Sequence, residues 1–350
     1  MLFHSLRWSF PTPSSKTNRS VERLMTMPHQ AGTHGARMEL KIRPLVREDL
    51  PDADRTMRVA FGTFMQMPNP EKFGEGTDHI KTRWITDPNA AFAAEVNGKL
   101  VGSSFATKWG SFGFFGPFTV HPDFWDQGVA KRLLVPTMDL FNKWGVSHTS
   151  LFTFAHSPKH LGLYQKFGFW PRYLTPIMSK TVQSSGEPEE WSKFSDAAGP
   201  GKEQYLAKCR NLAASVYNGL DLEREILAVR NQKLGDTVML WEGRTLTGFA
   251  VCHCGPGTEA ENDTCYIKFG TAGKGREADS AFERLLNACE EYARMRGVTS
   301  ILAGVNTACH NAYRTMLAHG YRTDTVGVLM LRPNQAALDN LDSYVICDLR

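Results

Sequence analysis

Apolar and polar positions follow two alternating periods between residues 39 and 180. Short runs with a period of two predict strands, and longer stretches with a period near 3.6 predict amphipathic helices. Asn97-Gly98 lies between two of the strands and predicts a tight hairpin turn, because both residues tolerate positive φ. The predicted strands are 40–46, 91–96, 100–109, 114–120, 148–154 and 170–179, and the predicted helices are 49–64, 79–84, 127–144 and 158–167.

The same order of elements recurs in residues 201–350. Helices are predicted at 204–216, 222–230, 281–296 and 309–319, a hairpin at 242–244, and strands at 265–270, 300–305 and 325–331. A helix-borne tyrosine followed by a glycine–aromatic pair occurs once in each half, as Tyr164 with Gly168-Phe169 and as Tyr313 with Gly320-Tyr321. The offset is about 150 residues, which is one domain length. The repeat therefore predicts two domains of one kind.

The chain divides into four parts by composition. Residues 1–38 are rich in Ser, Thr, Pro and Arg, and three interpretations remain open: a disordered tail, an over-extended start, or an organelle transit peptide. Residues 39–180 are the first predicted domain, and residues 201–350 are the second. Residues 181–200 are rich in Ser, Glu, Gly and Pro, which is typical of an interdomain linker.

The net charge argues against a nucleic-acid partner. The formal charge is +4, and residues 1–38 alone hold five basic residues against Glu22, so the remaining chain is neutral. A neutral body without a basic stripe lacks the electrostatic footprint of nucleic-acid binding. No stretch approaches the ~20 apolar residues that cross a bilayer, so we expect a cytoplasmic protein with no membrane partner.

Seven cysteines lie in the second half, and their pattern indicates reduced thiols. Their number is odd, no pair has CxxC spacing, and Cys252 and Cys254 alternate along an apolar run that predicts one buried strand face. His253 is predicted to point to the opposite face, so this run does not assemble metal ligands. We expect no metal.

The segment 118–134 combines a strand end, a glycine-containing turn and a helix start. The first backbone N–H groups of a helix have no partner inside it and carry the positive end of the helix dipole, which favours a pyrophosphate. Gly128 and Ala130 supply the small side chains that a close phosphate approach needs.

This segment resembles the acyl-CoA-binding motif of the GNAT acetyltransferase superfamily, V-x-P-x-x-[QR]-x-x-G-x-[GA]. Val120, Pro122, Gly128 and Ala130 match it, while Trp125 stands at the usual Gln or Arg position, where an indole does not donate as that side chain does. The resemblance implies two tandem acyl-CoA N-acyltransferase folds of the α/β (α+β) class, each a mixed, mostly antiparallel twisted sheet flanked by helices. It also implies that acetyl-CoA is bound by Phe118, Val120, Trp125, Asp126, Gln127, Gly128, Val129, Ala130, Lys131 and Ser157.

The resemblance implies catalysis without a covalent intermediate. Tyr164 matches the family tyrosine that protonates the leaving thiolate, although a helix tyrosine packed in the core gives the same pattern. His156 is our candidate for the general base, and His121 and Glu95 are alternatives, because the strand 111–120 carries no carboxylate.

The second half departs from the motif. Alignment of the two helices places Ser280 at the Gly128 position and Phe282 at the Ala130 position, where a large ring conflicts with phosphate binding. Asn306 and Tyr313, in contrast, match the later family motif better than the first half does. We expect a degenerate second domain that forms one wall of the acceptor cleft.

These observations predict an acetyl-CoA-dependent N-acyltransferase that acts on a primary amine of a small molecule. A homodimer is one of the oligomeric states left open. The loop 64–73 and Trp84, by family analogy, border the acceptor site, and their apolar content fits either a partly hydrophobic pocket or simple core closure. Two alternatives are a non-catalytic acyl-CoA sensor or scaffold and a tandem enzyme resembling mycothiol synthase, in which the second domain is the active one.

Overall fold

The computed structural model describes residues 39–183, 190–197, 199 and 201–350. The predicted tail, start or transit segment at 1–38 lies outside the described residues. Glu39–Arg350 form one compact unit. Among the described residues, no helix has both the length and the apolar composition needed to cross a membrane.

The first half follows the predicted order closely. The turn at Asn97-Gly98 has positive φ at both residues, as predicted. The elements are β1 (Leu40–Pro44), α1 (Leu50–Phe64), α2 (His79–Thr86), β2 (Ala91–Val96), β3 (Lys99–Trp109), β4 (Phe112–Val120), α3 (Val129–Trp144), β5 (His148–Phe154), α4 (Pro158–Gln165) and β6 (Trp170–Thr181).

The second half repeats this order and adds one short strand, β13, which has no counterpart in the sequence prediction. β7 takes the place of β1, since it pairs with β8 as β1 pairs with β2, and it lies inside the segment 181–200 that we expected to be a linker. The elements are β7 (Trp191–Lys193), α5 (Gly201–Val216), α6 (Glu223–Asn231), β8 (Gly235–Glu242), β9 (Thr245–Cys254), β10 (Thr264–Ala272), α7 (Ala278–Met295), β11 (Ser300–Gly304), α8 (His310–Ala318), β12 (Arg322–Arg332) and β13 (Val345–Ile346).

The strands of the described residues form one sheet in the order β1-β2-β3-β4-β5-β12-β6-β11-β10-β9-β8-β7, with β13 paired to β10. Only β4 with β5 and β10 with β11 pair in parallel. The fold is therefore the predicted mixed, mostly antiparallel sheet flanked by helices.

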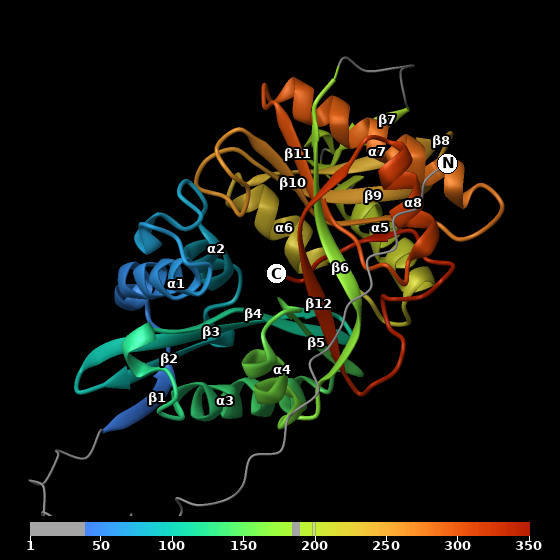
Figure 1. Ribbon diagram of the computed structural model, residues 1–350. Helices are drawn as coiled ribbons and strands as arrows, with labels where there is room; N and C mark the ends of the chain where they lie inside the picture. The colour runs from blue at the N-terminus through green and yellow to red at the C-terminus, as the bar shows by residue number, and fades with distance from the viewer. Residues whose placement is uncertain (1–38, 184–189, 198, 200) are drawn as a thin grey trace, which may run out of the picture. The chain divides into compact units, whose positions relative to one another are not determined.

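The two long strands at the middle of the sheet are exchanged between the halves. β12 of the second half pairs with β5 of the first, and β6 of the first half pairs with β11 of the second. β6 and β12 also pair with each other, and Figure 1 shows them side by side. Each half thus completes its part of the sheet with the last long strand of the other.

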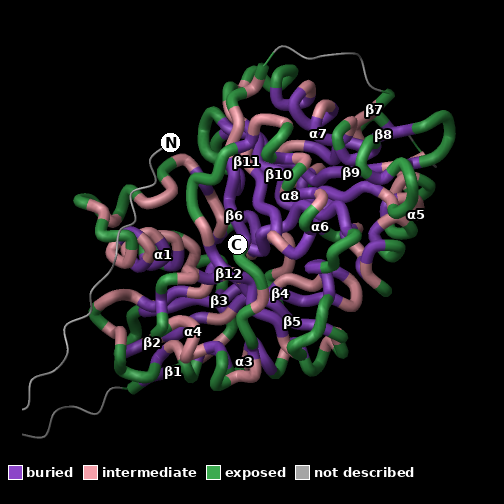
Figure 2. Tube along the Cα trace, turned by 45° about the vertical axis from the view of Figure 1, so that its right-hand side comes forward, coloured by how far each residue is buried: buried purple, intermediate pink, exposed green. Residues whose placement is uncertain are grey.

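Helices cover the sheet through apolar stripes. In α3, Leu133, Leu134, Met138 and Phe141 recur at helical spacing and are buried, while the opposite side is exposed. The cores of the two halves interpenetrate, because Phe112 and Phe114 of β4 pack in the cluster formed mainly by the second half. Figure 2 shows the strands as buried and the outer faces of the helices as exposed.

Candidate active site

The first feature of the candidate site is the divergence of β4 from β5. The two strands pair in parallel at only three positions, the last of which is Phe114 with Ser150. Beyond Phe114, β4 continues its pairing with β3 up to Val120, and β5 continues its pairing with β12 up to Phe154. Within the described residues, no strand pairs with residues 115–120 on the side that faces β5. We call this opening the first splay.

The start of α3 lies at the end of β4. Gly128 is the N-cap residue with φ +78°, and a Cβ atom built there meets nothing within 4 Å. No described side chain caps this helix, and its first turn contains no acidic residue. The N–H groups of Val129, Ala130 and Lys131 precede the first intrahelical hydrogen bond, which Arg132 donates to Gly128. The end of the helix is therefore open to an anionic group, as the resemblance implies.

Trp125 occupies this turn in an unexpected way. Its indole N–H donates to the carbonyl oxygen of Val120 over 2.6 Å. We expected that the indole does not donate as Gln or Arg does at this position, and the structure adds that it donates to the chain itself. Lys159 lies over the Trp125 ring, 5.5 Å from its centroid, and forms an ion pair with Asp126 at 2.7 Å. The turn is thereby tied to the start of α4.

The predicted acid, Tyr164, lies beside the first splay. Its ring packs edge-on against Phe115 at 5.8 Å and against Phe118 at 6.3 Å, both on β4. Burial raises the pKa of Tyr164, so its hydroxyl group stays protonated at neutral pH. The structure thus brings the rings of Tyr164 and Phe118 together.

Ser157 has a structural role at the start of α4. Its hydroxyl oxygen accepts a hydrogen bond from the His160 N–H and caps the helix. The side chain of Gln127 likewise bonds to the protein, because it donates to the carbonyl oxygen of Asp123. Neither side chain is directed to a ligand by these bonds.

The three candidate bases lie in different places. His156 is exposed at the end of β5, and its ring stacks on Phe64 of α1 at 5.6 Å. His121 accepts a hydrogen bond from the Asp123 N–H in the turn after β4. Glu95 is on β2 and accepts from Arg43 at 2.7 Å, two strands away from the splay. Of the three, His156 lies nearest to the elements that carry Tyr164.

His160 is a residue that the sequence analysis did not single out. It lies on α4, one helical turn before Tyr164, and its ring packs against Phe64 at 4.9 Å. Burial lowers the pKa of His160, and the neighbouring Lys159 and His156 lower it further. The spacing of four residues from Tyr164 was the available sequence signal.

Residues 59–169, from α1 to the end of the glycine–aromatic pair, match the sequence profile of the acetyltransferase (GNAT) family. This part of the chain is a GNAT-family domain. Members of this family use acetyl-CoA as co-substrate and act on amine acceptors, which supports acyl transfer in general.

Solved GNAT structures share the fold over most of this chain. A proposed acetyltransferase from Pyrococcus horikoshii is 14% identical, with 90% of this chain and 98% of that chain covered and a TM-score of 0.65. A GCN5-related N-acetyltransferase from Sphaerobacter thermophilus is 14% identical, with 86% and 98% covered and a TM-score of 0.53. A glucosamine N-acetyltransferase region of a fungal β-N-acetylglucosaminidase is 12% identical, with 85% and 38% covered and a TM-score of 0.57. None of the curated proteins compared with this chain matches it.

The second half of the chain has an equivalent divergence, and the chain itself fills it. β10 and β11 pair in parallel up to Ile267 with Ala303 and then separate. Beyond that point β13 pairs with β10, and the Cys347 N–H donates to the carbonyl oxygen of Gly304 on β11. Residues 344–347 therefore lie between β10 and β11, in what we call the second splay.

Phe282 also closes this part of the second half. Its side chain is fully buried, and its ring lies 5.4 Å from the ring of Tyr344. The start of α7 is thus packed against the segment that fills the second splay. Phe282 and residues 344–347 both close the second half where the first half has an unpaired strand edge.

A buried charged cluster lies where α2 meets the second half, and it consists of Arg83, Glu225, Glu259 and Lys268. Arg83 donates to Glu259 at 2.8 and 2.9 Å and to the carbonyl oxygen of Gly116 on β4. Lys268 lies 2.8 Å from Glu225 and 2.9 Å from Glu259. Burial alone would raise the pKa of Glu225, but Lys268 and His253 outweigh it and lower the pKa to about 2. No sequence pattern predicted this cluster, because its members come from three separate parts of the chain, near residues 83, 225 and 259–268.

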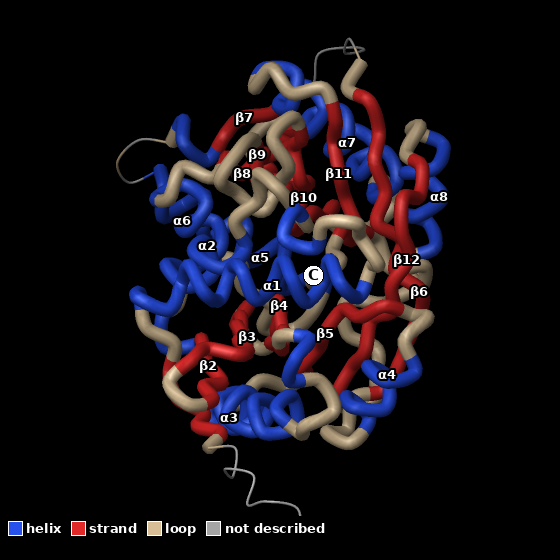
Figure 3. Tube along the Cα trace, turned by 60° about the vertical axis from the view of Figure 1, so that its left-hand side comes forward, coloured by secondary structure: helices blue, strands red, loops and turns tan. Residues whose placement is uncertain are grey.

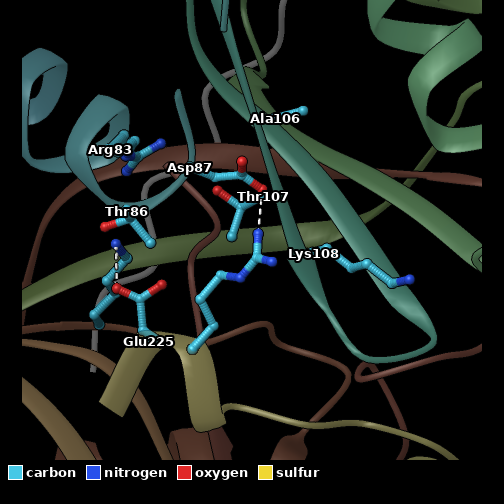
Figure 4. Close-up of a pocket in the computed structure, with 9 residues that line it drawn as sticks. Arg83, Thr86, Asp87, Ala106, Thr107, Lys108 and Glu225 are labelled. Carbon is cyan, nitrogen blue, oxygen red and sulfur yellow. Dashed lines mark hydrogen bonds and ion pairs between the residues drawn. The ribbon is translucent and has the colours of Figure 1, made fainter. Parts of the chain in front are cut away.

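A polar pocket borders the charged cluster (Figure 4). Figure 3 shows α2 beside α6 at this contact, and Gln232 donates to the Thr82 carbonyl oxygen across it. The charged groups around the pocket are paired with one another, as Arg224 is with Asp87 and Lys268 with Glu225. Because Arg224 and Asp87 come from different halves, the pocket lies at the contact between the two halves. It is lined by Arg83, Thr86, Asp87, Ala106, Thr107, Lys108, Arg224, Glu225 and Lys268.

Proposed function

We propose that this chain is an acetyl-CoA-dependent N-acyltransferase that acylates a primary amine of a small molecule and that its working site is the first splay. The observation that carries the proposal is the difference between the two splays. Within the described residues, no strand pairs with Phe115 to Val120 on the side that faces β5, although Arg83 donates to the Gly116 carbonyl oxygen, whereas residues 344–347 fill the second splay. The first half thus combines an unpaired strand edge with a helix start that no described side chain caps.

The residues of the first half fit a pantetheine pyrophosphate. The uncapped N–H groups of Val129, Ala130 and Lys131 are the donors that would hold the phosphates, and Gly128 leaves space beside them. The main chain near Phe118 would bind the pantetheine arm. Since Trp125 already bonds the Val120 carbonyl oxygen, we expect fewer contacts at that carbonyl than a Gln or Arg would allow.

We infer a direct transfer in which two side chains move protons. The amine nitrogen attacks the thioester carbonyl, so a C–N bond forms while the C–S bond breaks. His156 takes the proton that the amine loses, and Tyr164 gives its hydroxyl proton to the departing sulfur. Tyr164 can take this role because a tyrosine hydroxyl group is protonated at neutral pH before transfer. Solvent then restores both side chains.

The two alternative functions require different features of the structure. An enzyme resembling mycothiol synthase would use the second half, and the filled second splay argues against it. An acyl-CoA sensor would bind the ligand without turnover, and the bond between Trp125 and Val120 is compatible with it. Turnover separates the sensor from the enzyme.

Calorimetric titration of acetyl-CoA tests the location of the site. We expect one bound acetyl-CoA per chain, lost in Ala130→Trp and retained in Ser280→Trp, which introduces the same side chain at an exposed position near the start of α7. Loss of binding in Ser280→Trp alone would move the site to the second half. Absence of binding by the unmodified chain would remove the enzyme proposal.

Turnover with Tyr164→Phe tests the acid. Release of the free thiol with a primary amine should fall by about 10²-fold or more, the usual contribution of general acid–base catalysis. The affinity for acetyl-CoA should stay the same. Tyr173→Phe, at an exposed tyrosine on β6, is the control and should retain full activity.

A further inference from the structure

A group of aromatic and imidazole rings lies where β5, α4 and α1 meet. We call it the aromatic cluster, and Phe64 is at its centre. The Phe64 ring lies 4.7 Å from Phe154, 5.6 Å from His156 and 4.9 Å from His160. The Phe61 ring stacks on Phe73 at 5.2 Å and meets Phe154 at 6.2 Å. The members are Phe61, Phe64, Phe73, Phe154, His156 and His160.

The aromatic cluster is partly open to solvent. Its four phenylalanines and His160 are half-buried, and His156 is exposed. The aromatic rings that fill the core, such as Phe105, Phe115 and Phe169, are at most 2% exposed. Rings that only close a core would be buried like these. A group of half-buried rings is instead the kind of apolar surface that marks a ligand site.

The wall that carries Phe73 is held firmly in place. Arg58 donates to the carbonyl oxygens of Phe73, Gly74 and Thr77 over 2.6 to 2.7 Å. A Cβ atom at Gly62 would lie 2.3 Å from the Pro70 carbonyl oxygen, so only glycine allows the loop to approach α1 this closely. The ring surface is therefore formed before a ligand arrives, which reduces the entropic cost of binding.

The aromatic cluster adjoins the proposed chemistry. Phe154 is the last residue of β5, which forms one side of the first splay. His160 and Tyr164 are four residues apart on α4, so they lie on one face of the helix. A ligand that rests on the aromatic cluster thus lies one helical turn from the acid that we propose.

The ring surface of the aromatic cluster favours a flat apolar ligand with a positive end. Two carboxylates of the first half, Asp126 and Asp54, are already paired with Lys159 and Arg58. The faces of phenylalanine rings attract a cation and stack with another ring. These features suit an aromatic amine and offer little to a sugar or an acidic acceptor.

We propose that the acceptor is an arylalkylamine whose ring packs on the aromatic cluster and whose amine is directed to the first splay. This inference rests on the proposed N-acyltransferase function and specifies its substrate class. Phe64 is the central specificity residue, because it touches three of the other five rings.

The test compares three amines with the full chain and acetyl-CoA. We expect kcat/KM for 2-phenylethylamine to exceed the values for hexylamine and glucosamine by about two- to tenfold, since ring stacking contributes roughly 0.5–1.5 kcal/mol beyond apolar contact. Equal or lower kcat/KM for 2-phenylethylamine would overturn the inference.

Variants of Phe64 locate the preference. Phe64→Ala and Phe64→Leu should raise KM for 2-phenylethylamine about tenfold and leave the calorimetric affinity for acetyl-CoA unchanged, which also shows that the variants are folded. Tyr205→Ala, at a half-buried aromatic residue of α5, is the control and should change neither value. An unchanged KM in both Phe64 variants would contradict the inference.

The results distinguish a failure of the inferred substrate class from a failure of the proposed N-acyltransferase function. If acetyl-CoA binds and another amine is acylated preferentially, the aromatic preference fails and the N-acyltransferase proposal stands. If acetyl-CoA does not bind, or no amine is acylated, both fail.

Discussion

Trp125 illustrates how a single departure from a motif changes the local structure. Its side chain satisfies a backbone carbonyl of β4 that would otherwise face the first splay, and Lys159 covers its ring. The sequence identified the departure correctly. It did not identify the hydrogen-bond partner, because that depends on how the turn at residues 121–128 folds back on β4.

Replacement of Trp125 by glutamine should strengthen acetyl-CoA binding. The change frees the Val120 carbonyl oxygen and restores the polar residue of the motif, so the dissociation constant should fall by about three- to tenfold, equivalent to one net hydrogen bond of roughly 1 kcal/mol. Calorimetry measures the effect, with Trp170→Gln at an exposed position as control. A weaker affinity would mean that the indole itself contacts the ligand.

Residues of the candidate site were predictable to different degrees. Gly128 and Tyr164 belong to motifs that fix both residue type and spacing, and the structure gives Gly128 the positive φ that glycine favours. The roles of the predicted site residues in binding and catalysis stay predictions. His160 and Arg83 belong to no motif, since their partners come from α1 and from the second half.

At the scale of elements, long periodic segments were predictable and short ones were not. The helices and long strands agree with their predicted positions to within a few residues. β7 and β13 have only three and two residues, so they contain no detectable period. β7 forms because Trp191 and its neighbours pair with β8, in a segment whose composition is typical of a linker.

The short strand β13 should matter for stability far more than its length suggests. Ile346 is fully buried between β10 and β11, so Ile346→Ala should lower the free energy of unfolding by about 2–4 kcal/mol through loss of apolar contact and a residual cavity. Urea unfolding measures this change. Leu341→Ala, at a residue that is 72% exposed, should change stability by less than about 0.5 kcal/mol. A small effect at Ile346 would contradict the proposed packing.

At the scale of the whole molecule, the pairing of strands between the halves could not be predicted from the sequence. The repeat predicted two similar domains, and each was expected to pair its own strands. The exchange of β6 and β12 depends on contacts between residues at least 119 positions apart, such as Thr181 and Ser300. Periodicity contains no information on which strands pair. The domain boundaries, the cytoplasmic location and the homodimer likewise stay predictions.

Stability should decrease as the pH falls through the range of histidine titration. Burial lowers the pKa of five histidines, so the unfolded chain binds protons that the folded chain does not, and stability is lost below about pH 6.5. We expect the free energy of unfolding to be about 1–3 kcal/mol lower at pH 5.5 than at pH 7.5. The five residues are His79, His148, His160, His253 and His319.

Urea unfolding at the two pH values checks this expectation. The lowered pKa values of Glu225 and Glu259 affect stability only at more acidic pH, below about 4.5, so they do not obscure the result. His253→Gln should reduce the difference, because His253 is fully buried and its pKa is lowered mainly by burial. Equal stability at both pH values would show that these histidines are protonated in the folded state.

The exchange of β6 and β12 has a consequence for the ancestry of such a chain. Once each half relies on the other for a central strand, a crossover between genes near residues 181–200 separates each sheet from its completing strand. Recombination therefore cannot transfer either half alone with a complete sheet. The second half can therefore drift away from acyl-CoA binding and still be kept by selection, because deleting it would leave β5 without its neighbour.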